Sequence, residues 1–338
     1  MSLTTRSLQR SSLLDVNNRI FMLARQGKWL PTWYIAIIGS FVITIGSGLA
    51  LQFIFSQQPL ATLVPINSLI KSKDVYLSAL GQLLNFVITY STRILLLMVW
   101  IKVLEKRPFW TVGLERQAAL IKYLRGALLG IFMYGLAVSI LALTGCVIIV
   151  GGSIDQIGWG ALLGIIIILP GWLIQGASED LVTRGWLLPT MGARYRPWIG
   201  VIISALMFTL FHLPALLASG FNILALISGL TVSLFLAAYV LYEGGVWGVI
   251  GWHAAWNLAE GNLLASQVSG HDIAGGSLVK LVSVGPTWLT GGTFGPEAGA
   301  VVIAIVALGL LIIIALAHRR AAISNENEAA QLLASSSN

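Results

Sequence analysis

The chain has 338 residues, of which 57% are hydrophobic and only 10% are charged, and its formal net charge is +7. A soluble domain carries about 25% charged residues, so this composition excludes an ordinary soluble protein and predicts an all-α, polytopic membrane protein that has the lipid bilayer as a partner. The single cysteine, Cys146, excludes an internal disulfide and a multi-cysteine zinc site. No basic stripe with interleaved aromatic residues accompanies the positive charge, so we expect no nucleic-acid partner.

Eight apolar runs are long enough to cross the hydrocarbon of a bilayer, which takes about 20 helical residues. We therefore expect about eight transmembrane helices. Fifteen of the 20 lysine and arginine residues fall on the side of the N-terminus, counting Arg125 at the inner end of the third run, three fall on the opposite side, and Arg93 and Arg184 lie deeper within runs. This distribution predicts a multi-pass protein of the cell membrane with both termini in the cytoplasm. In chain order the runs are Trp33–Phe55, Val75–Ile101, Tyr123–Thr144, Trp159–Leu188, Trp198–Leu217, Leu224–Leu241, Val246–Leu264 and Ala298–Ala317.

The sequence divides into four predicted regions. The inner segment Lys102–Arg125 predicts a short interfacial helix with aromatic anchors. The long glycine-rich outer loop is expected to be wholly or partly ordered, and the polar C-terminal tail is expected to be disordered. The regions are residues 1–145, with the first three spans and the basic cytoplasmic segments; residues 158–264, a catalytic core; residues 265–320, the outer loop and the last span; and residues 321–338, the tail.

Two G-x-x-x-G sequences predict places where helices touch closely. They are Gly126–Gly130 in the third run and Gly244–Gly248 near the start of the seventh. Glycines four residues apart leave a smooth strip on which a second helix backbone can lie.

Ionisable side chains gather in the fourth run. Glu179 and Asp180 lie near its expected inner end, and Arg184 follows Asp180 by four residues, where it is well placed to pair with it. Charged groups at membrane depth are costly and usually functional, although such a cluster also serves as a structural ion pair. Arg93 lies in the second run. We interpret it as an arginine that is paired in the interior or that snorkels toward the inner interface. The alternative is that it provides the counter-charge to the acidic cluster.

Two histidines fall within later runs. His212 ends the sequence Phe208-Thr-Leu-Phe-His212, and His253 begins His253-Ala-Ala-Trp-Asn257, where the spacing of four puts His253 and Asn257 on one helix face. Each of these side chains alone is also typical of an interhelical hydrogen bond. Counted at 1.5 Å per residue, Glu179 and His253 fall near the inner face of the membrane, whereas His212 falls deeper.

Three further ionisable residues are expected to lie away from any site. Glu260 is interpreted as a rim residue near the outer part of its span. His271 is expected to be solvated in the outer loop, and His318, next to two arginines, to be interfacial.

These polar groups are suited to peptide hydrolysis. A carboxylate and an imidazole together hold and deprotonate a water molecule, and a second imidazole and an amide N–H stabilise the oxyanion that forms when this water attacks a peptide carbonyl. Two histidines and a carboxylate are also a recognised catalytic zinc set, here Glu179, His212 and His253. The sequence has no H-E-x-x-H and each candidate ligand lies on a different run, so no metal or other cofactor is favoured and Zn²⁺ is the alternative.

Three motifs resemble those of a known family. Glu179-Asp180-x-x-x-Arg184, Phe208-x-x-x-His212 and His253-x-x-x-Asn257 are similar to the motifs of the CAAX-protease and bacteriocin-processing (CPBP, or Abi) intramembrane endopeptidases. The similarity covers about Gly158–Leu264.

The resemblance implies a helical membrane hydrolase that cuts near the C-terminus of a membrane-associated or lipidated protein or peptide. It implies that Glu179 activates water with His212, that His253 and Asn257 stabilise the oxyanion, and that Arg184 holds the cluster in place. Members have been described both as metalloproteases and as metal-free glutamate enzymes, and the residues above favour the second. One departure is Asp180, where the family has a second glutamate, and its shorter side chain fits a pairing with Arg184 better than a catalytic role.

Two other classes of function remain open at this stage. A non-catalytic membrane scaffold or immunity protein would keep the polar cluster for helix packing. A proton-coupled transporter would use the same carboxylates and histidines as a relay, although no inverted repeat supports this class.

Overall fold

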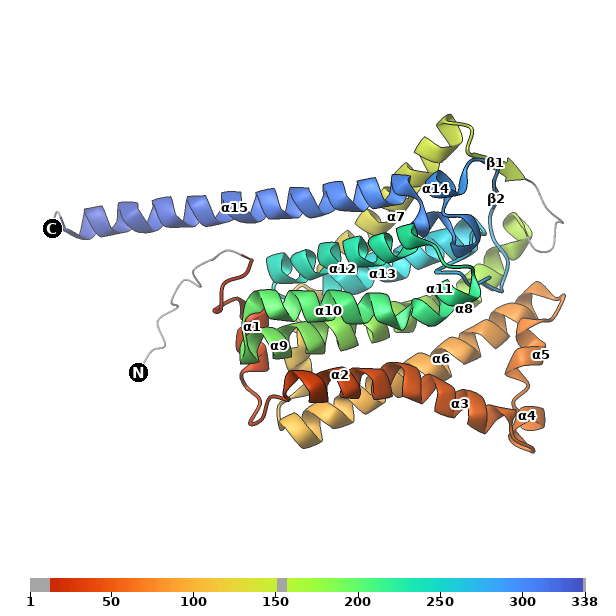
Figure 1. Cartoon of the computed structure of the whole chain (residues 1–338), viewed down its shortest axis with the longest axis horizontal. Helices are drawn as coiled ribbons and strands as arrows, with labels where there is room; N and C mark the ends of the chain where they lie inside the picture. The colour runs from red at the N-terminus through yellow and green to blue at the C-terminus, as the bar shows by residue number, and fades with distance from the viewer. Residues whose placement is uncertain (1–12, 151–156, 337–338) are drawn as a thin grey trace.

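The computed structural model describes residues 13–150 and 157–336 and consists of helices with one small sheet. Most of the long helices run in roughly the same direction along the bundle (Figure 1). The predicted class, a polytopic helical protein, is therefore confirmed. The first part of the chain forms α1 (Arg19–Ala24), α2 (Trp33–Phe41), η1 (Val42–Gly46), α3 (Ser47–Ser56), α4 (Leu60–Leu63), α5 (Ile66–Ile70), α6 (Val75–Val99), η2 (Trp100–Glu105), η3 (Phe109–Val112), α7 (Ala119–Leu143) and β1 (Val147–Val150).

The second part of the chain carries the three motifs. It begins with the fourth long helical segment, Trp159–Arg194, and it ends with a helix that extends well beyond the bundle (Figure 1). Its elements are η4 (Trp159–Ala161), α8 (Leu162–Asp180), η5 (Leu181–Leu187), α9 (Leu188–Arg194), α10 (Pro197–Phe211), α11 (Leu213–Ala218), α12 (Ile223–Glu243), α13 (Trp247–Leu258), η6 (Ala259–Leu263), β2 (Lys280–Ser283), α14 (Thr287–Thr290), η7 (Gly292–Phe294), η8 (Pro296–Ala298) and α15 (Ala300–Ser336).

Six segments within the described ranges are long and apolar enough to cross a membrane. Two of the eight expected runs form shorter helices instead, α10 with 15 residues and α13 with 12. The first is short because the chain turns at His212 and starts a separate helix, α11, with Pro214 in its first turn, where the missing backbone N–H of proline costs no hydrogen bond. The six segments are Trp33–Ser56, Val75–Glu105, Ala119–Leu143, Trp159–Arg194, Ile223–Glu243 and Ala300–Ile323.

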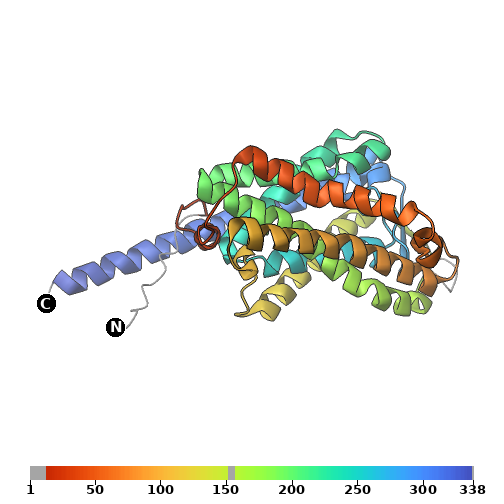
Figure 2. The ribbon, with the colours of Figure 1, turned by 90° about the horizontal axis from the view of Figure 1, so that it is seen from below.

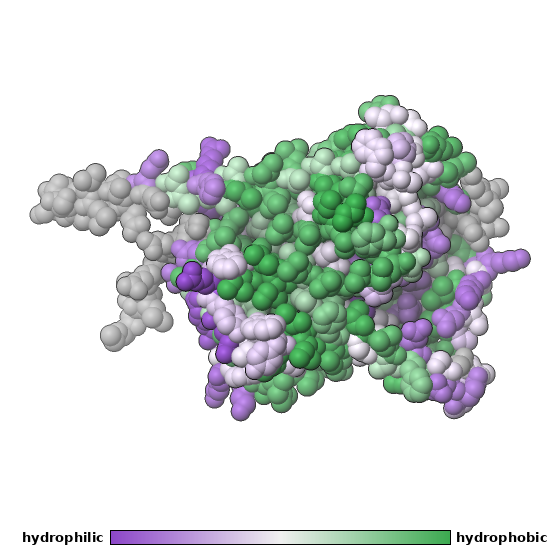
Figure 3. Space-filling view, in the orientation of Figure 1, coloured by the Kyte–Doolittle hydropathy of each residue, from purple (hydrophilic) through white to green (hydrophobic). Residues whose placement is uncertain are grey.

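The surface agrees with a protein that sits in a bilayer. Figure 3 shows hydrophobic residues over the middle of the molecule and hydrophilic residues gathered toward its two ends. A hydrophobic belt of this kind matches the hydrocarbon of a membrane, with the polar ends in the interfaces.

The fourth run is longer than predicted. The sequence predicts that this run ends at Leu188, one residue before Pro189. In the structure the chain widens into the π-helical η5 and continues through Pro189 as α9, so one helical segment of 36 residues extends to Arg194. Glu179 therefore lies near the middle of this segment, and the expectation that it lies near the inner end is wrong.

The close helix contact predicted for Gly126–Gly130 is present between α7 and α13. A Cβ atom on Gly126 would collide with the carbonyl oxygen of Gly248, and one on Gly130 with that of Trp252. The two backbones therefore touch, and this contact fixes the depth and rotation of α13. Gly244 has a different role, because it ends α12 with a φ of +71°, a conformation that glycine adopts without strain.

The glycine-rich loop between η6 and α15 is ordered, as expected. Asn262 anchors it, because its amide accepts from Trp172 Nε1 at 2.7 Å and donates to the carbonyls of Ala274 and Gly276 at 3.1 and 2.9 Å. One part of the loop forms β2, which pairs antiparallel with β1 so that Val147 lies opposite Ser283. The hydropathy pattern predicted no strand here.

Helices α2, α3 and α6 form a layer along one side of the motif-bearing helices, as Figure 2 shows from below. At the end of α6 a buried ion pair joins Arg107 Nε to Glu105 Oε2 at 2.7 Å, and the indole of Trp186 donates to Glu105 Oε1 at 2.5 Å. This contact ties the layer to the fourth segment. The interfacial helix expected in Lys102–Arg125 is the single 3₁₀ turn η3, in which Trp110 is exposed.

The expected disordered tail, residues 321–338, is wrong for residues 321–336. Helix α15 continues without a break to Ser336. Alanine, glutamate, glutamine and leucine are frequent in this stretch and favour helix, and no proline or glycine interrupts it. Residues 337–338 lie outside the described ranges.

Candidate active site

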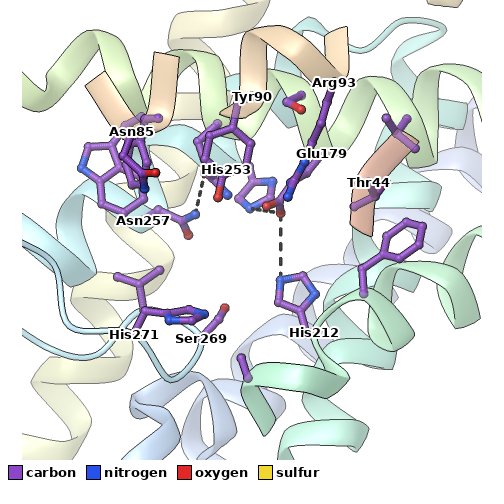
Figure 4. A pocket seen from close by; sticks show the side chains of 18 of the residues that line it. Thr44, Asn85, Tyr90, Arg93, Glu179, His212, His253, Asn257, Ser269 and His271 are labelled. Atoms are coloured by element: carbon purple, nitrogen blue, oxygen red, sulfur yellow. Dashed lines mark hydrogen bonds and ion pairs between the residues drawn. The ribbon is translucent and has the colours of Figure 1, made fainter. Parts of the chain in front are cut away.

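A cavity of about 370 Å³ lies between α6, α8, the end of α10, α13 and the loop that follows η6. The side chains of the three motifs meet in it (Figure 4). Polar groups line much of its wall, which is unusual inside an apolar bundle and gives water a place to bind.

Glu179 and the two histidines converge at the centre of this cavity. His253 Nε2 lies 3.6 Å and His212 Nε2 lies 4.0 Å from Glu179 Oε2. The difference in depth that counting residues predicted for His212 is absent. Glu179 precedes the end of α9 at Arg194 by 15 residues, and His212 follows the start of α10 at Pro197 by 15, so the antiparallel pair brings both to the same level.

His212 owes its orientation to the end of α10. Its Nδ1 lies 2.8 Å from the carbonyl oxygen of Phe208, one turn earlier, and its ring packs on the Phe208 ring with centroids 4.7 Å apart. A carbonyl can only accept, so we assign the proton to Nδ1, which leaves the lone pair of Nε2 facing Glu179.

Asp180 connects Arg184 to His253. Arg184 Nη1 donates to Asp180 Oδ1 at 3.0 Å, which is the pairing that the sequence suggested, and His253 Nδ1 lies 3.2 Å from Asp180 Oδ2. Both Asp180 and Arg184 are fully buried. The second contact holds the imidazole in one orientation, with Nε2 toward Glu179.

Arg184 is held by further contacts away from the cavity. Its Nη2 donates to Ser233 on α12 at 2.9 Å, and its guanidinium carbon lies 4.0 Å above the Phe208 ring. The aromatic residue of the second motif therefore packs between this cation and His212, and it links the first motif to the second.

Asn257 has a partner that the sequence did not single out. Its Nδ2 donates to Gln175 Oε1 at 2.9 Å, and both side chains are buried. Gln175 precedes Glu179 by four residues and so shares its face of α8. That spacing was the signal available in the sequence. The contact fixes the amide one turn beyond His253.

The outer loop also contributes to the cavity, which the sequence did not predict. Ser269, His271 and Asp272 line it, and Figure 4 shows His271 and Ser269 on the wall opposite Glu179. His271 is exposed, in agreement with the expectation that it is solvated, but it lines the cavity instead of lying away from any site. Desolvation within the cavity and then the neighbouring His212 lower the pKa of His271 from its ordinary value of 6.5, while Glu179 and Asp272 oppose the shift. The anchoring of the loop through Asn262, together with the hydrogen bond from Ser269 Oγ to Glu297 Oε2 at 2.8 Å, holds these residues at the site.

Two other residues differ from expectation. Glu260 is fully buried and is not a rim residue. Arg93, with Tyr90 and Asn85 of the same helix, lines the cavity instead of snorkelling to an interface.

The proposed zinc ligands Glu179, His212 and His253 are close to one another. Nevertheless, no group of three or more His, Cys, Asp or Glu side chains in the part of the chain that the structure describes is arranged to hold a metal ion.

Comparison with protein families gives one match. Residues 160–259 fit the family model described as type II CAAX prenyl endopeptidase Rce1-like. This range contains all three motifs and ends two residues after Asn257. No curated protein and no solved structure shows significant similarity to the chain.

Proposed function

Through residues 160–259 the chain belongs to the CAAX-protease family, and on that premise we propose a specific reaction for the cavity. The protein hydrolyses a peptide bond near the C-terminus of a membrane-associated or lipidated protein, with a water molecule that Glu179 and His212 activate. His253 and Asn257 stabilise the oxyanion. The observation that carries the proposal is the convergence of Glu179 and the two histidines within 4.0 Å in a polar cavity of an apolar bundle.

Glu179 is the base in this mechanism. Its Oε2 is buried and receives no hydrogen bond from the described residues, whereas the lone pair of His212 Nε2 faces it. A water that donates one hydrogen to each is oriented for attack. Its oxygen bonds to the carbonyl carbon while a proton passes to Glu179, and the same proton goes to the amine nitrogen when the C–N bond breaks.

His253 and Asn257 act on the carbonyl oxygen. In its doubly protonated form His253 donates from Nδ1 to Asp180 and from Nε2 toward the oxyanion. Asn257 gives one N–H to Gln175 and has a second one for the same oxygen. These donors are held in place before the reaction, which is what makes oxyanion stabilisation effective.

The test uses purified protein in lipid vesicles and a fluorescent prenylated peptide that ends in a CAAX sequence. We expect Glu179→Gln and His253→Ala to lower kcat/KM by about 10²-fold or more, the usual contribution of a general base or an oxyanion donor. Glu326→Gln, which changes an exposed glutamate of α15 in the same way, is the matched control and should have no effect.

Full activity of either variant would contradict the assignment. A non-catalytic scaffold predicts a different outcome, in which the variants lose thermal stability and no preparation cleaves the peptide. Metal dependence is tested on the same protein. The metal-free mechanism expects activity to survive a chelator, and stoichiometric zinc whose removal abolishes activity would replace it with metal catalysis by Glu179, His212 and His253.

A further inference from the structure

Arg93 lies at the depth of Glu179 on the neighbouring helix. Helices α6 and α8 run parallel, because a Cβ on Gly164 would contact Val75 and one on Gly171 would contact Phe86. From the second of these contacts, Arg93 is seven residues further along α6 and Glu179 is eight residues further along α8. At 1.5 Å per residue the two positions are level.

The guanidinium of Arg93 has no anionic partner among the described residues. No carboxylate lies within 4.0 Å of it, and its Nε is buried without a hydrogen bond. Its contact is with the ring of Tyr90, 4.7 Å from its central carbon. Arg184, on the neighbouring segment, is by contrast paired with Asp180 and bonded to Ser233. Arg93 is thus a permanent cation without a counter-ion at membrane depth, a costly state unless a ligand supplies the anion.

Among the described residues, neither carboxylate that lines the cavity forms an ion pair with this cation. Glu179 faces the two histidines, and Asp272 Oδ1 accepts from Gln267 at 3.1 Å. Of the described residues that line the cavity, Arg93 is the one arginine or lysine. Figure 4 shows its side chain entering the cavity from α6, across from His271 and Ser269.

We propose that Arg93 binds the free C-terminal carboxylate of the substrate. A guanidinium matches a carboxylate with two parallel hydrogen bonds, which makes this pair strong and directional. The inference rests on the proposed function, because a substrate that is cut near its C-terminus brings such a carboxylate into the cavity together with the scissile bond. Arg93 then selects chain ends over internal peptide bonds.

The proposal limits how far from the chain end the cut falls. An extended residue spans about 3.3–3.6 Å, so each residue added after the scissile bond moves the carboxylate by that distance. When the added residues place the carboxylate out of reach of Arg93, we expect the peptide with a free acid to be cleaved no better than the peptide with a carboxamide.

The experiment compares two prenylated CAAX peptides that differ only in ending as a free acid or as a carboxamide. We expect the wild-type protein to cleave the acid with a kcat/KM about 10- to 100-fold higher, the range for a hydrogen bond to a charged group. Arg93→Met should lower the value for the acid to that of the amide and leave the amide almost unchanged. Arg93→Lys, which keeps the charge, should restore part of the preference.

Arg320→Met is the matched control. Arg320 also lies over a tyrosine ring, 3.9 Å from the centroid of Tyr242, but outside the cavity, and its loss should leave the acid-to-amide ratio as in the wild type. If Arg93 acted only through its effect on Glu179 or on the packing of α6, Arg93→Met would lower kcat/KM for both peptides by the same factor. That result, or a wild-type enzyme indifferent to amidation, overturns the inference.

A binding measurement separates this inference from the proposed function. Analogues of both peptides with an N-methylated scissile bond resist cleavage, and their dissociation constants are measured on wild-type and Arg93→Met protein. Tighter binding of the acid that Arg93→Met abolishes supports the carboxylate site even if no peptide is hydrolysed. Equal binding of acid and amide to the wild type rejects it even if hydrolysis depends on Glu179.

Discussion

Glu179 and Asp180 are neighbours in the chain with opposite surroundings. Asp180 is fully buried, bonded to Arg184 and in contact with His253, whereas Glu179 Oε2 receives no hydrogen bond from any described residue. A carboxylate that is fully paired supports structure, and one that is left unpaired beside two histidines is available for chemistry. The aspartate that departs from the family pattern is therefore in the supporting position.

This difference predicts that two similar substitutions have different effects. Asp180→Asn leaves the buried cation of Arg184 without its counter-charge, and we expect a loss of about 3–5 kcal/mol in the free energy of unfolding. Glu179 Oε2 has no hydrogen bond to lose among the described residues, so Glu179→Gln should lower activity while keeping most of the stability. Denaturant or thermal unfolding in detergent, read beside peptide cleavage, measures both.

Asp180→Glu is the informative companion, because it restores the residue typical of the family. It should retain most of the stability that Asp180→Asn loses. Equal stability of Asp180→Asn and the wild type would show that Asp180 does not carry the buried charge pair.

The sequence predicted the pair of Asp180 with Arg184 but not the contact with His253. The first depends on spacing within one helix. The second depends on how closely α8 approaches α13, where a Cβ on Gly176 would lie 3.0 Å from the backbone nitrogen of Ala254. A contact between residues 73 positions apart cannot be read from local periodicity.

At the scale of elements, the crossing of α7 and α13 sets the position of His253, the histidine proposed to stabilise the oxyanion. Gly126→Ala would place a methyl group against the carbonyl of Gly248, so we expect a destabilisation of about 1–3 kcal/mol and a loss of activity as His253 moves. Gly135→Ala on the same helix meets nothing within 4 Å, and it should be neutral or stabilise by about 0.4–1 kcal/mol.

Thermal unfolding of both variants checks this prediction. If Gly135→Ala destabilised the protein as much as Gly126→Ala, helix packing at Gly126 would not be the cause. The G-x-x-x-G spacing was sufficient to predict this contact, because the pattern lies within one helix and its physical effect is local.

The element boundaries were harder to predict than the elements. The fourth run was ended before Pro189, and that error of six residues created a false difference in depth between Glu179 and His212. The outer loop was recognised, but its return to the cavity depends on the tertiary bonds of Asn262 to Trp172 and to the loop backbone. Hydropathy reports which segments are apolar and says nothing of such bonds.

At the scale of the whole molecule, the charge distribution predicts the orientation in the membrane. Gln26 and Ser283 are exposed and belong to opposite ends of the bundle, near α1 and on β2 (Figure 1). With the termini in the cytoplasm, a membrane-impermeant maleimide applied to intact cells should label Ser283→Cys and spare Gln26→Cys, both in a Cys146→Ser background. Labelling of Gln26→Cys alone would reverse the orientation.

The residues that line the cavity come from the family-matched stretch and from the stretches on either side of it. The groups proposed to cut the peptide lie within residues 160–259, whereas Thr44, Tyr90 and Arg93 come from the earlier helices and His271 from the later loop. Under the proposed function, chemistry and substrate choice are encoded in separable stretches. We therefore expect sequence change in the flanking stretches to alter which substrate is accepted and to leave the cleavage chemistry intact, so that one core can serve unrelated substrates. Exchanging α2–α6 between two such proteins is expected to carry the preference of the donor with it.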